Sequence, residues 1–306
     1  MTTTSKLTAP FPYFGGKSLV ANEVWARFGN VPNYVEPFAG SCAVLLARPT
    51  EPNLETVNDA DGLLSNFWRA IKYDPHAVAE WADWPVSEAD LHARNRWLIG
   101  CRESLTEKLI ADPDWFDARC AGWWVWGAST WIAGGWCTKE KLGYRQKPRL
   151  FGHGNGIHSK SRGDLFEIFK LLALRLRKVR VCCGDWSRVV SPGCLSVNGL
   201  TAIFLDPPYT DQANRDDRIY GVDSFTVGRE VKEWAISNGN NPKLRIAVCG
   251  YEGEYEFPAD WECLRWRTPG GHARGATGQT KGKLNSTRER IWFSPFCLRE
   301  NFLFEM

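Results

Sequence analysis

The sequence predicts an α/β protein whose largely parallel sheet is interrupted by a long, mostly helical insertion. Short apolar runs, typical of buried strands, alternate with segments whose apolar residues recur at helical spacing. This alternation occurs on both sides of residues 74–162 and stops within them. Strand–helix alternation favours a parallel sheet, because each helix returns the chain to the edge where the next strand starts. A length of 306 residues suits one large domain or one domain with an insertion.

Each predicted element rests on such a run. Before the insertion, residues 10–17 predict a structured loop that is rich in Pro, Gly and aromatic residues. Helices are then expected at residues 18–28, 43–47 and 63–71, and strands at residues 33–38 and 54–57. After the insertion, helices are expected at residues 164–178 and 226–237, and strands at residues 179–182, 201–205, 244–249, 262–268 and 289–293.

The insertion is rich in tryptophan and in positive charge. Six of the 16 tryptophans lie between Trp115 and Trp136, and we expect them to form the core of a helical region more than a row of base-stacking platforms. Residues 139–162 contain seven Lys or Arg and one acid, as do residues 265–290, so each segment carries +6. Because the whole chain carries +3, the remainder sums to −9. Two basic segments on an acidic body indicate a polyanionic partner, with solvated loop charge as the alternative.

Several classes of protein are disfavoured by the composition. No apolar run approaches the roughly 18 residues of a membrane span, and the N-terminus does not resemble a signal peptide, so we expect a soluble cytoplasmic protein of a bacterium or a phage-infected cell. The ten cysteines form no Cys-x-x-Cys pair, which argues against a zinc site. We expect reduced, mostly buried thiols and no metal.

The strongest local signal is the run Ala-Ile-Phe-Leu-Asp-Pro-Pro-Tyr at residues 202–209, in which a predicted buried strand ends at Asp206. Ligands bind at the carboxyl ends of strands in open α/β sheets. The amino nitrogen of a nucleobase is a poor nucleophile, and acceptors on its two N–H bonds make its lone pair available to an incoming methyl group. The Asp206 carboxylate and the Pro207 carbonyl are such acceptors, Pro208 fixes the backbone, and the Tyr209 ring can stack on the base.

The surrounding motifs resemble those of the Dam-like DNA adenine methyltransferases, in the same order. Pro-Tyr-Phe-Gly-Gly-Lys at residues 12–17 is similar to the N-terminal cofactor motif of that family, and residues 34–41 to its first glycine-containing motif. Asn58-Asp59 and Asp185 match its acidic positions, and residues 287–295 its closing motif. Cys42 departs from the pattern, since the family often has a further glycine there. The resemblance covers most of residues 10–73 and 179–296, and implies a Rossmann-like methyltransferase sheet with an inserted target-recognition region.

The resemblance also implies S-adenosylmethionine as the cofactor. Lys17 is expected to meet the cofactor carboxylate beside backbone N–H groups, Asp59 to bind the ribose hydroxyls and Asp185 to accept from the adenine amino group. Two roles stay open: Glu36 contacts the methionine amino group or anchors its loop, and Phe38 packs against the cofactor or fills the core. The expected cofactor site comprises Tyr13, Gly15, Gly16, Lys17, Glu36, Phe38, Gly40, Asp59, Asp185 and Asp206.

A stacked base cannot be methylated at its amino group, so the resemblance implies that adenine is flipped out of double-stranded DNA. It divides the chain into a catalytic domain at residues 1–73 and 179–306 and a recognition domain at residues 74–178. Basic side chains are expected to contact phosphates. The candidates for contacts with base edges are Gln146, Asn155, His158 and Arg162, and the alternative for each is a surface residue without a role in binding. The expected DNA contacts are Lys139, Lys141, Arg145, Lys147, Arg149, Asn155, His158, Lys160, Arg162, Arg274, Lys281 and Lys283.

Three other functions compete with adenine-N6 methylation of a specific DNA sequence. A cytosine-N4 methyltransferase uses the same amino-group chemistry, although such enzymes more often carry Ser at the position of Asp206. A catalytically idle DNA-binding or regulatory protein keeps the fold without the reaction. An RNA substrate fits the basic charge equally well. A monomer or weak dimer is expected, and the recognition sequence, any restriction nuclease partner and a bacterial or phage source stay open.

Overall fold

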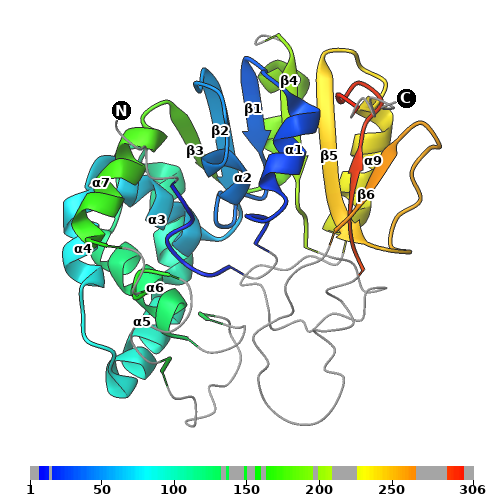
Figure 1. Ribbon diagram of the computed structural model, residues 1–306. Coiled ribbons are helices and arrows are strands. Elements are labelled where there is room, and N and C mark those ends of the chain that lie inside the picture. The colour runs from blue at the N-terminus through cyan, green and yellow to red at the C-terminus, as the bar shows by residue number, and fades with distance from the viewer. Residues whose placement is uncertain are drawn as a thin grey trace, which may run out of the picture.

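The computed structural model describes residues 7–13, 16–131, 136–137, 148–149, 156–159, 163–195, 199–208, 226–266 and 288–299. Seven strands form one sheet in the order β3-β2-β1-β4-β5-β7-β6 (Figure 1). The strands are β1 (Asn33–Glu36), β2 (Leu54–Asp59), β3 (Val179–Cys183), β4 (Thr201–Leu205), β5 (Leu244–Tyr251), β6 (Glu262–Arg265) and β7 (Glu289–Phe293). Strands β1 to β5 run parallel to one another, whereas β7 runs antiparallel between β5 and β6.

Helices cover both faces of this sheet and gather beyond its β3 edge (Figure 1). The α-helices are α1 (Ala21–Phe28), α2 (Ala43–Leu46), α3 (Gly62–Tyr73), α4 (Pro75–Ala82), α5 (Glu88–Ala111), α6 (Ala118–Thr130), α7 (Leu165–Leu176), α8 (Pro192–Leu195) and α9 (Val227–Asn238), and a 3-10 helix, η1, spans Trp186–Val190. The mixed α/β class and the mainly parallel sheet confirm the predicted fold class, and the architecture is that of a Rossmann-like methyltransferase.

The two faces of the sheet belong to separate hydrophobic clusters. Along β4, Ala202 and Phe204 pack into the cluster that contains α1, α2 and α3, while Ile203 and Leu205 pack into the cluster that contains α9 and η1. Alternation with period two is what a strand produces. Because both faces are covered, the five residues of β4 are all buried, which explains the continuous apolar run in the sequence.

The inserted helices share the larger cluster with the sheet. Trp124, Trp126 and Trp131 are buried in it, and the other three tryptophans of the cluster between residues 115 and 136 pack against it. The expectation that these tryptophans form a helical core is therefore confirmed. Phe11, from the N-terminal loop, packs edge-on against Trp124 with a centroid separation of 4.8 Å. The insertion thus contacts the very segment that leads into the first cofactor motif.

The predicted elements exist, with shifted ends. The first helix starts at Ala21 because residues 18–20 form a turn, β2 continues through Asp59, and β5 continues to Tyr251. β6 ends at Arg265, earlier than expected. All ten cysteines are free thiols, in agreement with the expected reduced state, and six of them are buried.

Candidate active site

A pocket of about 400 Å³ lies at the carboxyl ends of β1, β2, β3 and β4. The chain leaves β1 toward β2 on one side, whereas β4 lies on the other, so the strand order changes direction here and a crevice results. The pocket is lined by Tyr13, Gly16, Lys17, Glu36, Pro37, Phe38, Ala39, Gly40, Ser41, Ala43, Asn58, Asp59, Ala60, Asp61, Gly184, Asp185, Trp186, Phe204, Asp206, Pro208, Thr226, Val227 and Glu230. Every described residue of the expected cofactor site is among them.

Asp206 projects into this pocket directly after β4. Its Oδ2 lies 2.8 Å from the Nζ of Lys17, and the Lys17 side chain is only 3% exposed. Burial raises the pKa of the Asp206 carboxyl, while Lys17 and the Cys249 thiol act in the opposite direction. Burial disfavours the charged form of Lys17 too, but Asp206 and Glu289 outweigh it and raise the Lys17 pKa. The pair is therefore an ion pair in the pocket lining, with a buried Lys17 and a partly buried Asp206.

The sequence did not predict this pairing. The Lys17 ammonium contacts Asp206 and lies 5.8 Å from the ring centroid of Trp266, and its expected contact with the cofactor carboxylate stays a prediction. Residues 18–20, which follow Lys17, form a turn that leads into α1. Pro207 and Pro208 follow Asp206, and Tyr209 and Gly15 lie outside the described residues.

The loop after β1 is held by Asp59 from β2. The Gly40 backbone N–H donates to Asp59 Oδ2 at 3.1 Å, and the Asp61 N–H donates to Asp59 Oδ1 at 2.9 Å. Burial raises the pKa of Asp59 to about 6 despite these two donors. Gly40 has a φ of +45°, and a Cβ there would come within 2.7 Å of the Tyr13 ring. Gly40 is thus required both by its backbone conformation and by the approach of Tyr13.

Glu36 lies at the end of β1 and is 2% exposed. It accepts a hydrogen bond from the Tyr34 hydroxyl at 3.0 Å. Burial raises the pKa of its carboxyl to about 8, so Glu36 is mainly protonated at neutral pH in the free protein. A cationic group that enters the pocket beside Glu36 would favour the carboxylate form.

The opposite wall is formed by residues after β3. Asp185 accepts from the backbone N–H of Ser187 at 2.9 Å, and also from the Ser187 hydroxyl, so it caps η1. The rings of Phe38 and Trp186 stack with centroids 6.0 Å apart. Phe38 is partly buried against the cluster that contains α9 and η1 and also lines the pocket, and its contact with the cofactor stays a prediction.

The expected site omitted several of the lining residues, among them Asn58, Asp61 and Trp186. Asn58 donates to the Pro37 and Gly184 carbonyls at 3.0 and 2.9 Å, which fastens the β1 and β3 loops together. Asp61 caps α3 by accepting from the Leu63 N–H and pairs with Arg102 at 3.3 Å. A carboxylate directly before an apolar helical run is a capping signal that points to Asp61. Trp186 carried no comparable signal beyond its position next to Asp185.

Only two of the expected DNA contacts fall within the described residues. The Arg149 backbone N–H donates to the Thr130 carbonyl at 2.7 Å, at the end of α6. His158 is 9% exposed, with its ring edge-on to Trp126, and burial lowers its pKa. The others, like Gln146, lie outside the described residues; they are Lys139, Lys141, Arg145, Lys147, Asn155, Lys160, Arg162, Arg274, Lys281 and Lys283.

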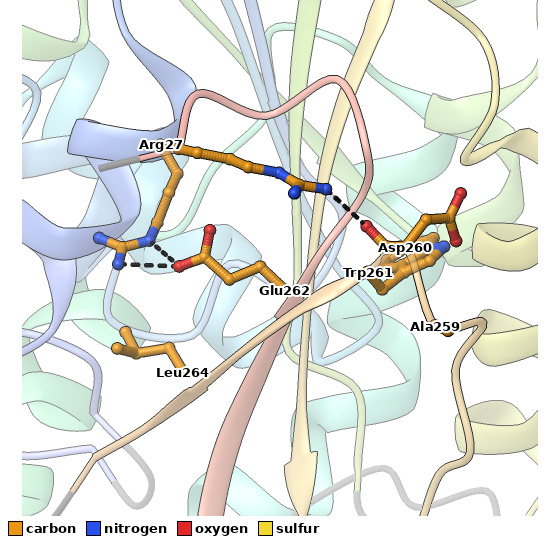
Figure 2. A pocket seen from close by; sticks show the side chains of 7 residues that line it. Arg27, Ala259, Asp260, Trp261, Glu262 and Leu264 are labelled. Carbon is orange, nitrogen blue, oxygen red and sulfur yellow. Dashed lines mark hydrogen bonds and ion pairs between the residues drawn. The ribbon is translucent and has the colours of Figure 1, made fainter. Parts of the chain in front are cut away.

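A second pocket, of about 480 Å³, lies beside β6 (Figure 2). Its residue Arg27 lies in the last turn of α1, just before β1 begins, so this pocket is at the amino ends of the strands, opposite the first pocket. Arg27 points to Glu262 at 3.0 Å, and Arg299 donates to the Asp260 carbonyl at 3.1 Å (Figure 2). The sequence singled out none of its residues, and the first pocket alone collects the matched motifs.

The described parts of the chain hold no cluster of three or more His, Cys, Asp or Glu side chains placed to bind a metal ion. Within the same parts, every helix is too short or too polar to cross a membrane.

The fold and the pocket define a methyltransferase of Rossmann-like architecture, with acidic residues at the ends of four neighbouring parallel strands. Residues 13–88 match the family model described as D12 class N6 adenine-specific DNA methyltransferase. The match confirms the resemblance to Dam-like enzymes and supports an adenine-specific DNA methyltransferase enzyme. It spans Lys17, Glu36 and Asp59 and ends at residue 88, inside the insertion. A comparison with curated protein sequences gave no match.

Proposed function

We propose that this protein transfers a methyl group from S-adenosylmethionine to N6 of an adenine flipped out of a specific double-stranded DNA sequence. The observation that carries the proposal is the Asp206 carboxylate, which ends a buried strand, opens into the pocket and is fixed by a buried Lys17 at 2.8 Å. A carboxylate held in this way is preorganised to accept an amino N–H without reorganising during the reaction.

The pocket residues fit the proposed cofactor. S-adenosylmethionine carries a sulfonium and an ammonium, and it supplies an electrophilic methyl group. The lining offers six carboxyl groups and one lysine, a balance that favours a cationic ligand. Asn58 Oδ1 is buried without a hydrogen-bond partner among the described residues, so a ligand donor would satisfy it. The volume of about 400 Å³ falls within the usual range of small-molecule sites.

Each wall of the pocket then has a task. Glu36 meets the methionine ammonium, Asp59 and Asp61 face the ribose hydroxyls, and Asp185 accepts from the adenine amino group, beside the Phe38 and Trp186 rings. Pro208 and Asp206 separate this space from the target base. Asp206 and the Pro207 carbonyl accept the two amino N–H bonds, which directs the nitrogen lone pair toward the methyl group, and Tyr209 stacks on the base. The proton lost from the amino nitrogen passes to Asp206 or to water.

DNA recognition is assigned to the insertion, residues 74–178, together with the basic C-terminal segment. Residues 139–162 of the insertion and residues 265–290 each contain seven Lys or Arg against one acid, in a chain whose remainder is acidic. Cations in this number hold the phosphates of the duplex, while the sequence is read at base edges. The helical core of the insertion provides the rigid support that such side chains need.

The test is methylation of mixed-sequence duplex DNA by the purified full-length chain with tritiated cofactor, followed by nucleoside analysis. N6-methyladenine is the expected product. Asp206→Asn should reduce the rate by at least about 100-fold, because it removes an anionic acceptor at the reacting nitrogen while preserving shape. Cofactor binding by the variant, followed by calorimetry, shows that the pocket is intact. N4-methylcytosine as the product would contradict the adenine assignment, and an unmodified duplex despite cofactor binding would contradict the enzymatic one.

A further inference from the structure

The helical insertion contains two thiols in contact, away from the pocket just described. Cys101 lies on α5 and Cys120 on α6, and their Sγ atoms are 3.6 Å apart. Cys120 is buried at 1% exposure, whereas Cys101 is partly exposed. Of the ten free cysteines, Cys101 and Cys120 contact each other, and Cys101 is also partly accessible to solvent.

From this geometry we propose that Cys101 and Cys120 form a redox modification site, in which hydroperoxides oxidise the pair to a disulfide that joins α5 to α6. A disulfide has an S–S length of about 2.05 Å, so the sulfurs must approach by about 1.5 Å. Both residues lie on packed helices, and a small rotation of the exposed Cys101 side chain is the simplest way to close that gap.

The environment assigns a distinct role to each sulfur. Cys120 hydrogen-bonds to Cys101, and this interaction lowers the Cys101 pKa. The exposed member of the pair therefore holds the larger fraction of thiolate, the form that reacts with peroxides. The buried member is the resolving thiol, since it already touches the sulfur that it must attack.

The reaction balances in two steps. The Cys101 thiolate attacks a peroxide oxygen, the O–O bond breaks, and hydroxide or alkoxide leaves, so that Cys101 becomes a sulfenic acid and the peroxide is reduced. The Cys120 sulfur then attacks the Cys101 sulfur, the S–O bond breaks, and the oxygen leaves as water with the Cys120 proton. One peroxide thus oxidises two thiols, and thiol reductants reverse the change.

The position of the pair links it to the pocket. Arg102 follows Cys101 on α5, and its guanidinium lies 3.3 Å from Asp61, a residue of the pocket wall. Cys120 lies in the first turn of α6, where its N–H donates to Asp117 at 2.8 Å. A disulfide here would tie the helix that carries Arg102 to the capped end of α6.

The test uses the reduced full-length protein, treated with stoichiometric hydrogen peroxide and then denatured in guanidinium chloride with N-ethylmaleimide, so that buried thiols also react. Mass spectrometry of the intact chain should show that alkylatable thiols fall from ten to eight. Digestion without reduction should yield one linked pair of peptides, containing Cys101 and Cys120, which dithiothreitol separates. Cys120→Ser should instead accumulate a sulfenic acid at Cys101 that dimedone traps.

Cys263→Ser is the matched control, because Cys263 is exposed and lies on β6, so its loss should leave the yield of the linked peptides unchanged. The buried Cys137 provides the competing pairing. A Cys101–Cys137 link would overturn the proposal, as would full alkylation of Cys101 and Cys120 after peroxide has oxidised Cys263. Cross-link mapping on the unmodified sequence gives a decisive answer even if a serine variant does not fold.

Discussion

At the scale of single residues, the site is organised by charges that are removed from water. Asp206 and Lys17 neutralise each other at 2.8 Å, and Glu36 is stabilised as a neutral acid by its burial. Removing one member of a buried pair leaves the other uncompensated, so these residues depend on one another more than surface charges do. Their protonation should therefore be visible both in the pH dependence of methylation and in cofactor binding.

Lys17→Gln should move the acidic limb of the pH–rate profile to higher pH. Lys17 lowers the Asp206 pKa against the effect of burial, so its loss lets that pKa rise further. Because the carboxylate is the proposed active form, the rate should drop near neutral pH and partly recover as pH increases. Single-turnover methylation across pH measures this shift, with Lys17→Arg as the variant that keeps the cation. If the variant had a higher KM for the cofactor but an unchanged acidic limb of the pH–rate profile, Lys17 would instead contact the cofactor carboxylate.

Glu36 should release a proton when S-adenosylmethionine binds. At pH 7 the medium is below the Glu36 pKa of about 8, so the free protein holds this proton. An ammonium beside Glu36 favours the carboxylate, and affinity should therefore increase with pH until about pH 8. Calorimetry in buffers of different ionisation enthalpy detects the release, which Glu36→Gln should abolish. Binding by the native protein without proton release would mean that Glu36 only anchors its loop.

At the scale of elements, the site depends on how the loops after the strands are fastened. Asn58 bridges the carbonyls of Pro37 and Gly184, and Asp59 holds the Gly40 N–H, so β2 fixes the loops of both neighbouring strands. β2 is itself anchored by Glu55, which is fully buried. Because Gly40, Asn58 and Asp59 also line the pocket, the residues that fasten the loops belong partly to the site itself.

Gly40→Ala should destabilise the protein by about 1–3 kcal/mol and weaken cofactor binding. The added Cβ would be forced into a left-handed backbone conformation and would meet the Tyr13 ring at 2.7 Å. Gly100→Ala is the matched control, since Gly100 is helical with open space around it, and the change should stabilise the protein by about 0.5–1 kcal/mol. Urea unfolding compares the two. Equal effects would show that the turn at Gly40 is not sterically constrained.

Glu55→Ala should cost about 3–5 kcal/mol of unfolding free energy. Glu55 accepts from Arg48 at 3.2 Å and from Arg175 of α7 at 2.9 Å, so its loss leaves two guanidinium groups without their carboxylate and loosens α7 from β2. Glu167→Ala, on the exposed face of α7, removes a surface pair with Lys170 and should change stability by less than about 0.5 kcal/mol. Denaturant titration of both variants provides the comparison. A small change in unfolding free energy for Glu55→Ala would contradict a stabilising role for the ion pairs of Glu55 with Arg48 and Arg175.

At the scale of the whole molecule, the sequence was sufficient to predict the strands of the parallel part of the sheet and the acidic residues at the ends of those strands. Apolar runs and helical spacing are local signals, and Asp59, Asp185 and Asp206 stand directly after such runs. The contact between Lys17 and Asp206 could not be predicted, because it depends on how distant segments meet. For the same reason the antiparallel position of β7 between β5 and β6 carried no local signal.

The distribution of charge over the molecule should govern its affinity for DNA. Each phosphate that a cation neutralises contributes about −0.9 to the slope of log K against log salt concentration. Replacing both Lys139 and Lys141 with Gln should therefore make the slope less steep by about 2 if both lie on phosphates. Lys243→Gln is the control, because Lys243 is exposed just before β5, at the end of the sheet opposite the pocket, and its loss should leave the slope unchanged. Fluorescence anisotropy of a labelled duplex over a salt series measures both slopes. An unchanged slope in the double variant would show that Lys139 and Lys141 do not contact phosphates. The phosphate contacts would then be expected in the C-terminal basic segment, residues 265–290.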